Sequence, residues 1–255
     1  MSSAVISILV VICCCASAAI GITLHIKLPD RHFDSDSKDV VKSVMAVVAT
    51  MAALVLGLLI ASAKSSFDTQ ATDIQQLSAN VVQLDRVLAL YGSETGEARK
   101  LLRGMVIGTH ERIWPADANQ KLDLNPSGNW GFAQPLYVSL EKLSPANDTQ
   151  RRAQTMALGL AAELSHARLL MFEQIGGATS WQLLVVLIFW LSVLFLGFGL
   201  FARPSIIIVG AFLVGSVSVG SAFFLILELS QPYGGFMQVP DIAVQKALVE
   251  LNRSY

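Results

Sequence analysis

Four long apolar segments alternate with polar segments along the chain. They cover about Ser3–Thr23, Val40–Ala63, Ser180–Phe201 and Ser205–Leu227. A helix of about 20 apolar residues crosses a bilayer core roughly 30 Å thick, so each segment is long enough to span a membrane. The third and fourth segments are joined by a tight turn at Arg203-Pro204. Such a short connection predicts an antiparallel helical hairpin.

A polar stretch, Lys64–Thr179, separates the second and third apolar segments and shows helical periodicity. Apolar residues recur there at alternating steps of three and four: Ile74, Leu77, Val81, Leu84, Leu88 and Tyr91. This spacing is typical of a coiled-coil seam. Between Val40 and Tyr91 only Gly57 weakens a helix. The pattern therefore predicts one continuous helix that leaves the membrane and ends at Gly92.

Further helices are predicted at about 93–113, Leu136–Leu143, Asp148–Gln174 and 241–251. The second of these lies within 114–145, a region rich in Pro, Gly, Asn and Asp, which predicts loops around at most one short helix. No stretch alternates apolar and polar residues over the length of a strand, and no repeat occurs. The predicted architecture is therefore all-helical.

The predicted fold class is an all-α integral membrane protein, with four transmembrane helices in a two-plus-two layout and a helical extramembrane insert. Residues 1–63 hold transmembrane helices 1 and 2, and 64–179 form the insert. Residues 180–227 hold transmembrane helices 3 and 4. Residues 228–255 form a turn and a short helix that we expect to pack on the insert.

The composition agrees with a membrane protein. Of the 255 residues, 53% are hydrophobic and only 15% are charged, and the mean hydropathy is +0.57. The net charge of −1 gives no broad basic surface, which argues against a nucleic-acid partner. The three cysteines, Cys13–Cys15, are consecutive in one apolar run and cannot link distant parts of the chain. We interpret them as small buried hydrophobic residues.

The N-terminus and the orientation each allow two interpretations. Ala16-Ser17-Ala18 resembles a signal-peptidase site, but Met1-Ser2-Ser3 lacks basic side chains, which favours an uncleaved membrane anchor. Basic residues near the span ends are concentrated in the connecting loops: Lys27, Arg31, Lys38, Lys42 and Arg203, against Lys64 and Arg168 on the insert side. Counted this way, the positive-inside rule places the insert outside the cytoplasm, but acidic residues of the first loop are interleaved with these basic ones, so the count does not decide the orientation. The alternative is a cytosolic insert, with which the lack of a disulfide framework there is compatible.

Small residues line one face of two spans. They are Ala49, Ala53 and Ala61 in the second segment, and Ala211, Gly215, Ser218 and Ala222 in the fourth. Small side chains let helix backbones approach closely in membranes, so these stripes predict helix packing and self-association. An alternative remains for the second segment. Ser43, Thr50, Gly57 and Lys64, spaced by seven, are candidates to line a water-filled path in an oligomer.

The centres of the spans hold no ionisable residue suited to a proton relay, which disfavours proton-coupled transport. Glu228, at the end of the fourth span, is the nearest candidate, and we interpret it as a solvated carboxylate at a helix terminus. A passive pore remains compatible, because backbone dipoles, hydroxyls and apolar constrictions conduct and gate ions without formal charge.

The case for an enzyme is weak. Glu163 and His166 have the spacing of helical metal ligands, with His110 and Glu111 as further candidates, but chance produces this pattern easily. The chain has no phosphate-binding glycine loop, nucleophile elbow or zinc-ligand spacing. We expect no catalytic residue, no metal and no cofactor.

Three features carry a resemblance to a known family. The last span ends in Glu228 and is followed by the turn Gln231-Pro232-Tyr233-Gly234-Gly235-Phe236, the second span exits through Leu56-Gly57-Leu58-Leu59 into Ser65-Ser66-Phe67, and the spans have the two-plus-two layout. In these features the chain resembles the bacterial bestrophin-like domain family, a family of unknown function that is remotely related to the bestrophins. The resemblance implies a multi-pass protein of the bacterial inner (cytoplasmic) membrane.

Bestrophins are pentameric anion channels in which the second helix lines the pore and the insert and termini form a cytosolic assembly. By this resemblance the pore-facing helix is Val40–Ala63, extended through Lys64–Tyr91. Where the bestrophin neck carries bulky aromatics, this chain offers Val47, Met51, Leu54 and Leu58. The resemblance implies a homo-oligomer in membrane lipid that passes small inorganic anions such as chloride.

An alternative function belongs to a different class. The continuous helix also suits a membrane signalling or scaffolding protein that relays motion from the bilayer to the helical insert. Such a protein binds a partner on the surface of the insert and has no water-filled path along the oligomer axis.

Overall fold

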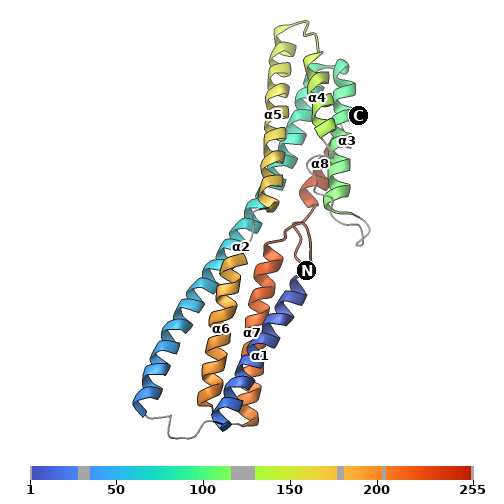
Figure 1. Ribbon diagram of the computed structural model, residues 1–255. Coiled ribbons are helices and arrows are strands. Elements are labelled where there is room, and N and C mark those ends of the chain that lie inside the picture. The colour runs from blue at the N-terminus through green and yellow to red at the C-terminus, as the bar shows by residue number, and fades with distance from the viewer. Residues whose placement is uncertain (1, 28–34, 116–129, 177–180, 203–204, 254–255) are drawn as a thin grey trace. The chain divides into compact units, whose positions relative to one another are not determined.

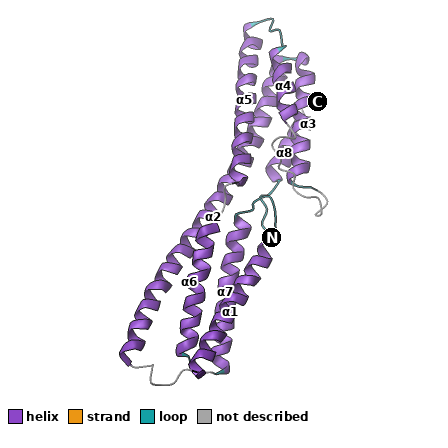
Figure 2. Cartoon of the chain, in the orientation of Figure 1, coloured by secondary structure: helices purple, strands orange, loops and turns teal. Residues whose placement is uncertain are grey.

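The structure is a computed structural model that describes residues 2–27, 35–115, 130–176, 181–202 and 205–253. Within these ranges every regular element is a helix, as Figures 1 and 2 show. The helices are α1 (Ser3–Lys27), α2 (Ser35–Tyr91), α3 (Gly96–Ile113), α4 (Trp130–Glu141), α5 (Asp148–Gly176), α6 (Trp181–Phe201), α7 (Ile206–Leu229) and α8 (Ile242–Arg253). A short 3₁₀ helix, η2 (Ser93–Thr95), precedes α3. The predicted all-α fold class is confirmed.

The chain divides into two compact units. The first comprises Met1–Ser66 and Ala178–Ser230, and the second comprises Phe67–Gly177 and Gln231–Tyr255. Helix α2 contributes to both, because it is a single helix of 57 residues. The prediction of one unbroken helix from Val40 to Tyr91 is therefore confirmed.

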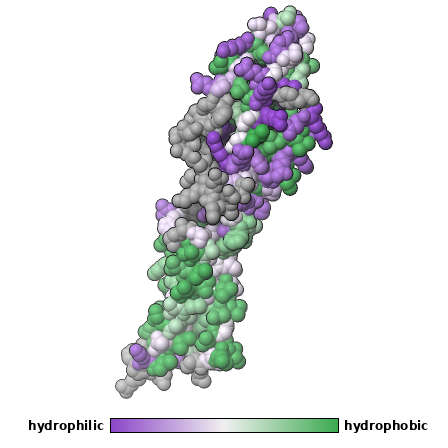
Figure 3. Space-filling view, turned by 90° about the vertical axis from the view of Figure 1, so that its right-hand side faces the viewer, coloured by the Kyte–Doolittle hydropathy of each residue, from purple (hydrophilic) through white to green (hydrophobic). Residues whose placement is uncertain are grey.

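The first unit carries the apolar helices. Within the described residues, α1, α6, α7 and the apolar part of α2 are long and apolar enough to cross a membrane. The face of this unit in Figure 3 is mostly hydrophobic, which suits contact with lipid. Helix α1 packs against both α6 and α7.

Glycines bring α1 close to its neighbours. A Cβ added at Gly21 of α1 would meet the backbone of α6 at the Leu196 carbonyl oxygen and, at 2.8 Å, the Leu200 nitrogen. A Cβ added at Gly199 would meet the Ala18 carbonyl oxygen of α1. The two backbones are thus in direct contact at this crossing, and only glycine fits there.

The second unit has a core built on the seam of α2. Val81, Leu84, Leu88 and Tyr91 are buried together with residues of α3, α4, α5 and α8, and Leu77 packs against them partly buried. Ile74 is buried in an adjoining cluster with Ile113, Met171, Tyr233 and Val239. Five of the six seam positions are buried and Leu77 is partly buried, which confirms the predicted interface, since helical periodicity places them on one face.

An ion pair lies inside this unit. The Arg99 guanidinium of α3 donates to the Asp85 carboxylate of α2 through Nε at 2.7 Å and through a terminal nitrogen at 3.0 Å. The two side chains are only 13% and 5% exposed. This bidentate contact holds α3 against α2 at a defined register.

Helix α4 begins at Trp130, earlier than the predicted Leu136, and Pro135 is its sixth residue. A proline at this position lacks the backbone N–H that would donate to the carbonyl four residues earlier, so α4 has one hydrogen bond fewer than an uninterrupted helix. The carbonyls at the other end of α4 are satisfied by a neighbour: the side-chain amide of Gln154 in α5 donates to Leu140 and Leu143, both at 2.9 Å.

Gly92 ends α2 with a φ of 133° and a ψ of −173°, a conformation open essentially to glycine alone. We expect Gly92→Ala to lower the free energy of unfolding by about 1–3 kcal/mol because alanine is strained there. Gly96→Ala is the matched control, since Gly96 has helical angles and open space around its Cα. Chemical denaturation followed by circular dichroism measures both. An equal effect of the two substitutions would contradict the assignment.

Candidate functional site

The part of α2 in the first unit has a buried side and an exposed side. Met45, Ala52 and Leu59, spaced by seven, are buried. The Met45 side chain lies against Gly197 of α6, and a Cβ added at Gly197 would be only 2.6 Å from the Met45 sulfur. The candidate pore residues lie on the opposite side, because they are offset from these positions by about half a turn. Val47, Met51, Leu54 and Leu58 are 53–70% exposed.

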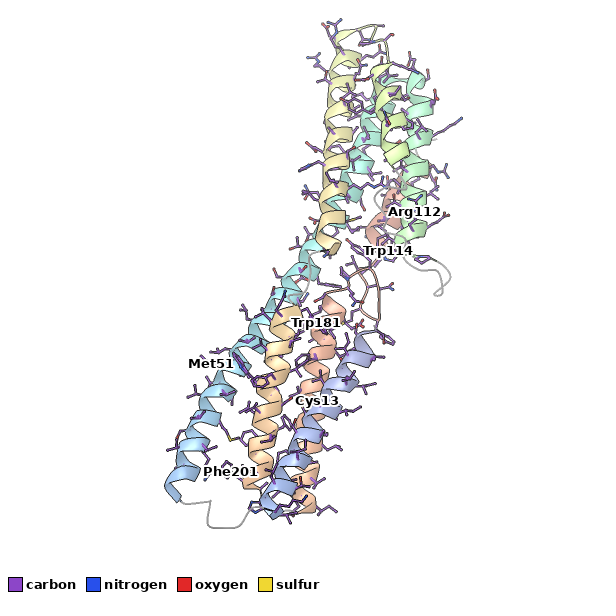
Figure 4. The ribbon with its side chains drawn as sticks, in the orientation of Figure 1. Cys13, Met51, Arg112, Trp114, Trp181 and Phe201 are labelled. Atoms are coloured by element: carbon purple, nitrogen blue, oxygen red, sulfur yellow. The ribbon has the colours of Figure 1, made fainter. Side chains whose placement is uncertain are left out.

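The four polar or small pore candidates are also exposed on α2: Ser43, Thr50, Gly57 and Lys64. The Ser43 hydroxyl donates to the Asp39 carbonyl at 2.8 Å, and the Thr50 hydroxyl donates to the Ala46 carbonyl at 2.9 Å. Both hydroxyl hydrogens are therefore engaged within α2 itself. Figure 4, which labels Met51, shows where this stretch of α2 lies.

The predicted packing stripes are largely uncovered within one chain. Ala53, Ala61, Ala211 and Ser218 are exposed, and Ala49, Gly215 and Ala222 are half-buried. The close approaches inside the chain instead involve Gly21, Gly197, Gly199 and Gly220. Of these four, the sequence pattern singles out only Gly220, as one of the small residues of the fourth segment that favour tight bundling, and not Gly21, Gly197 or Gly199. The feature of the sequence that could have indicated a close helix contact is the pair Gly197 and Gly199, which stand among bulky residues in the third span. Packing of the predicted stripes against another copy stays a prediction.

The interpretation of Glu228 as a solvated carboxylate is wrong. Its side chain is 3% exposed, and the whole last turn of α7, Ile226–Leu229, is buried. Position at a helix end does not give exposure when the surrounding turn is packed. An ionisable residue buried at the end of a span is a functional candidate by default, because burial of a charge is costly.

The turn after α7 is held by its own backbone. The Gly234 amide donates to the Gln231 carbonyl at 3.0 Å, and the Val239 amide donates to the Pro232 carbonyl at 2.9 Å. Gly235 has a φ of 95°, which favours glycine. Tyr233, next to Pro232, is buried, and burial raises the pKa of its phenol, with a further rise from the Asp73 carboxylate.

Two side chains hold the segment that follows this turn: His110 of α3, and Trp114, the residue directly after α3. The Trp114 indole N–H donates to the Val239 carbonyl at 2.9 Å. His110 Nε2 lies 2.9 Å from Asp241 Oδ2, which also accepts a 2.6 Å hydrogen bond from the Gln245 amide. The hydrogen bond from His110 lowers the pKa of Asp241.

A lowered pKa means that the charged carboxylate of Asp241 stabilises the fold. This contribution is present above the ordinary pKa of 3.8 and is lost as the pH falls through the lower folded-state value. We expect Asp241→Asn to lower the free energy of unfolding by about 1.5 kcal/mol at pH 6. The difference from the original protein should shrink below pH 4. Urea denaturation at both pH values measures it, and a difference that grows on acidification would contradict the assignment.

The residues considered for a metal site are not brought together. Glu163 and His166 are exposed on α5, whereas His110 is paired with Asp241. Across the described part of the chain, no group of three or more His, Cys, Asp and Glu side chains is placed to hold a metal ion. The geometry therefore gives no support to metal-dependent catalysis at these residues.

Comparison with known proteins gives one family match. The family model of the bestrophin-like domain matches residues 12–244, which is most of the chain from α1 to the start of α8. No curated protein and no solved structure gives a match.

Proposed function

The chain belongs to the bestrophin-like family, and from this membership we propose that it forms an oligomeric membrane channel that passes small anions such as chloride. In this proposal α2 lines the pore. The observation that carries it is the face of α2 formed by Val47, Met51, Leu54 and Leu58, which is apolar, exposed and opposite the buried side of the same helix.

An exposed apolar face on a spanning helix is covered by lipid or by further copies of the chain. The uncovered small-residue stripe of Ala53 and Ala61 favours further copies, because small residues permit close contact between helices in lipid. If copies of α2 surround a common axis, one part of the exposed side of each helix contacts the next copy, and the adjacent part faces the axis. The family resemblance implies a pentamer and a location in the bacterial inner membrane.

The apolar side chains on this face of α2 suit a gated pore. The hydroxyl hydrogens of Ser43 and Thr50 are engaged within α2, so the stretch from Val47 to Leu58 offers an anion few donors. Apolar constrictions of this kind control conduction by wetting and drying. Lys64, exposed at the end of the stretch, supplies a positive charge that raises the local concentration of anions.

Reconstitution into liposomes tests the proposal. We expect purified oligomers to carry chloride flux above that of empty liposomes, and Lys64→Glu to lower the permeability of chloride relative to potassium. A single subunit per particle, or folded oligomers without conductance, would contradict the proposal.

Cysteine accessibility tests the role of α2 more directly. In a background with Cys13, Cys14 and Cys15 replaced by alanine, Leu54→Cys is expected to react with a charged thiol reagent and lose most of the flux. Val217→Cys on α7, also exposed, is the matched control and should keep its flux. Equal loss at both positions would argue against a pore along α2.

The continuity of α2 favours the second candidate function, a signalling or scaffolding protein that relays motion along this helix. That function requires a protein partner on the second unit. Oligomers that do not conduct but bind such a partner with a defined stoichiometry would support it over the channel.

A further inference from the structure

The second unit contains a cavity of ≈ 90 Å³ where its two buried apolar clusters meet. The wall includes Val81, Leu102 and Leu164 of the larger cluster, and Ile113 and Met171 of the smaller one. Apolar cavities stay dry and accept apolar ligands of matching size. A cavity of about 150 Å³ holds benzene, so in proportion this one accepts about four non-hydrogen atoms. The space therefore suits a very small and mainly apolar molecule.

Three polar side chains at the wall are already engaged. The Ser78 hydroxyl donates to the Ile74 carbonyl at 2.8 Å, and the indole of Trp114, labelled in Figure 4, donates to the Val239 carbonyl at 2.9 Å. Arg168 takes part in another interaction of the chain, so its charge is not available to a ligand. A charged ligand would enter without a partner for its charge, and burial of an unpaired charge is costly. The wall therefore selects a neutral molecule.

Thr109 of α3 supplies the polar group that remains at the wall. Three other threonines, Thr50, Thr72 and Thr155, each donate to the carbonyl four residues earlier in their helix, at 2.9–3.0 Å. Thr109 is half-buried, and its hydroxyl makes no such bond, nor any other hydrogen bond to the described part of the chain. A hydroxyl both donates and accepts hydrogen bonds. This position therefore suits contact with one oxygen atom of a ligand.

We propose that this cavity binds a small neutral molecule of about three carbon atoms and one oxygen, such as a short-chain alcohol. Its oxygen exchanges a hydrogen bond with the Thr109 hydroxyl, and its carbon atoms lie among the apolar side chains. Met105 and Met171, which line the cavity, can adjust their flexible side chains to the ligand. The site lies wholly within the second unit and does not depend on a pore along α2.

The test uses the full chain in detergent and 3-fluoropropan-1-ol as the probe, followed by ¹⁹F NMR with protein-free micelles as the blank. We expect saturable binding that propan-1-ol displaces. Equal concentrations of n-propylammonium chloride or sodium propionate, which are similar in size but charged, should displace at least about tenfold less. This comparison requires no variant. Displacement by either ion as effective as that by propan-1-ol, or no saturable binding to folded protein, would overturn the proposal.

Two variants locate the site. Thr109→Val keeps the shape of the side chain but removes its hydroxyl, and should weaken binding by about threefold to tenfold. Thr155→Val, at an exposed threonine of α5 away from the cavity wall, is the matched control and should change binding by less than about 1.5-fold. Ala247→Leu fills the cavity from α8 and should abolish saturable binding. Unchanged binding in folded Thr109→Val or in folded Ala247→Leu would overturn the assignment. The readout is independent of conductance, so its failure is distinct from failure of the channel proposal.

Discussion

Replacing Asp85 with alanine is expected to lower the free energy of unfolding by about 3–5 kcal/mol, because Arg99 then stays buried without its bidentate contact to this carboxylate. The side chains are 5% and 13% exposed, so water cannot replace the lost contact without local opening. Chemical denaturation of the detergent-solubilised protein, followed by circular dichroism, measures the change.

Two controls separate charge burial from simple loss of a hydrogen bond. The double variant Asp85→Leu/Arg99→Leu removes both charges, and buried ion pairs replaced in this way by apolar residues often leave stability unchanged or raise it. We therefore expect it to recover most of the lost stability. Glu250→Gln breaks the exposed pair with Arg253 and should cost less than about 0.5 kcal/mol. A double variant as unstable as the single one would show that the pair acts through specific geometry rather than charge balance.

The second large effect concerns the crossing of α1 and α6. Gly21→Val is expected to lower the free energy of unfolding by about 3 kcal/mol, since the added atoms collide with the backbone at Leu196 and Leu200, which cannot move aside like a flexible side chain. The helices must separate, and the contacts along their length weaken together. Titration with a denaturing detergent measures the loss of helix.

Gly210→Val is the matched control. Gly210 lies on α7, and a Cβ there would meet no atom within 4 Å. We expect its stability to stay within about 0.5 kcal/mol of the original. The double variant Gly21→Ala/Gly199→Ala should cost less than the sum of the single variants, because both act at one contact. Strict additivity would place the two glycines at independent sites.

Local periodicity predicted most of the helices, because the spacing of apolar residues within one helix is enough to identify the face that becomes buried. Ile74, Leu84 and Leu88 were placed on a seam by spacing alone, and all three are buried. Gly92 was predicted as the end of α2 from its chemistry, and its φ of 133° is the reason. These inferences needed no knowledge of a partner helix.

Contacts between distant segments could not be predicted in the same way. The pairing of Gly21 with Gly199 depends on how α1 and α6 cross, which no local pattern encodes. The burial of Glu228 and the contact between His110 and Asp241 likewise depend on tertiary packing. For the candidate site, spacing predicted which residues share a face of α2, while a pore role for that face depends on other copies of the chain.

The way α4 ends bears on the order in which the second unit forms. A helix of 12 residues that contains a proline is marginal in isolation. Its last carbonyls are satisfied by the Gln154 side chain of α5, which follows it in the chain. We therefore expect α4 to stay frayed during synthesis until α5 has emerged and docked, and its amide protons to gain protection from exchange only in step with those of α5.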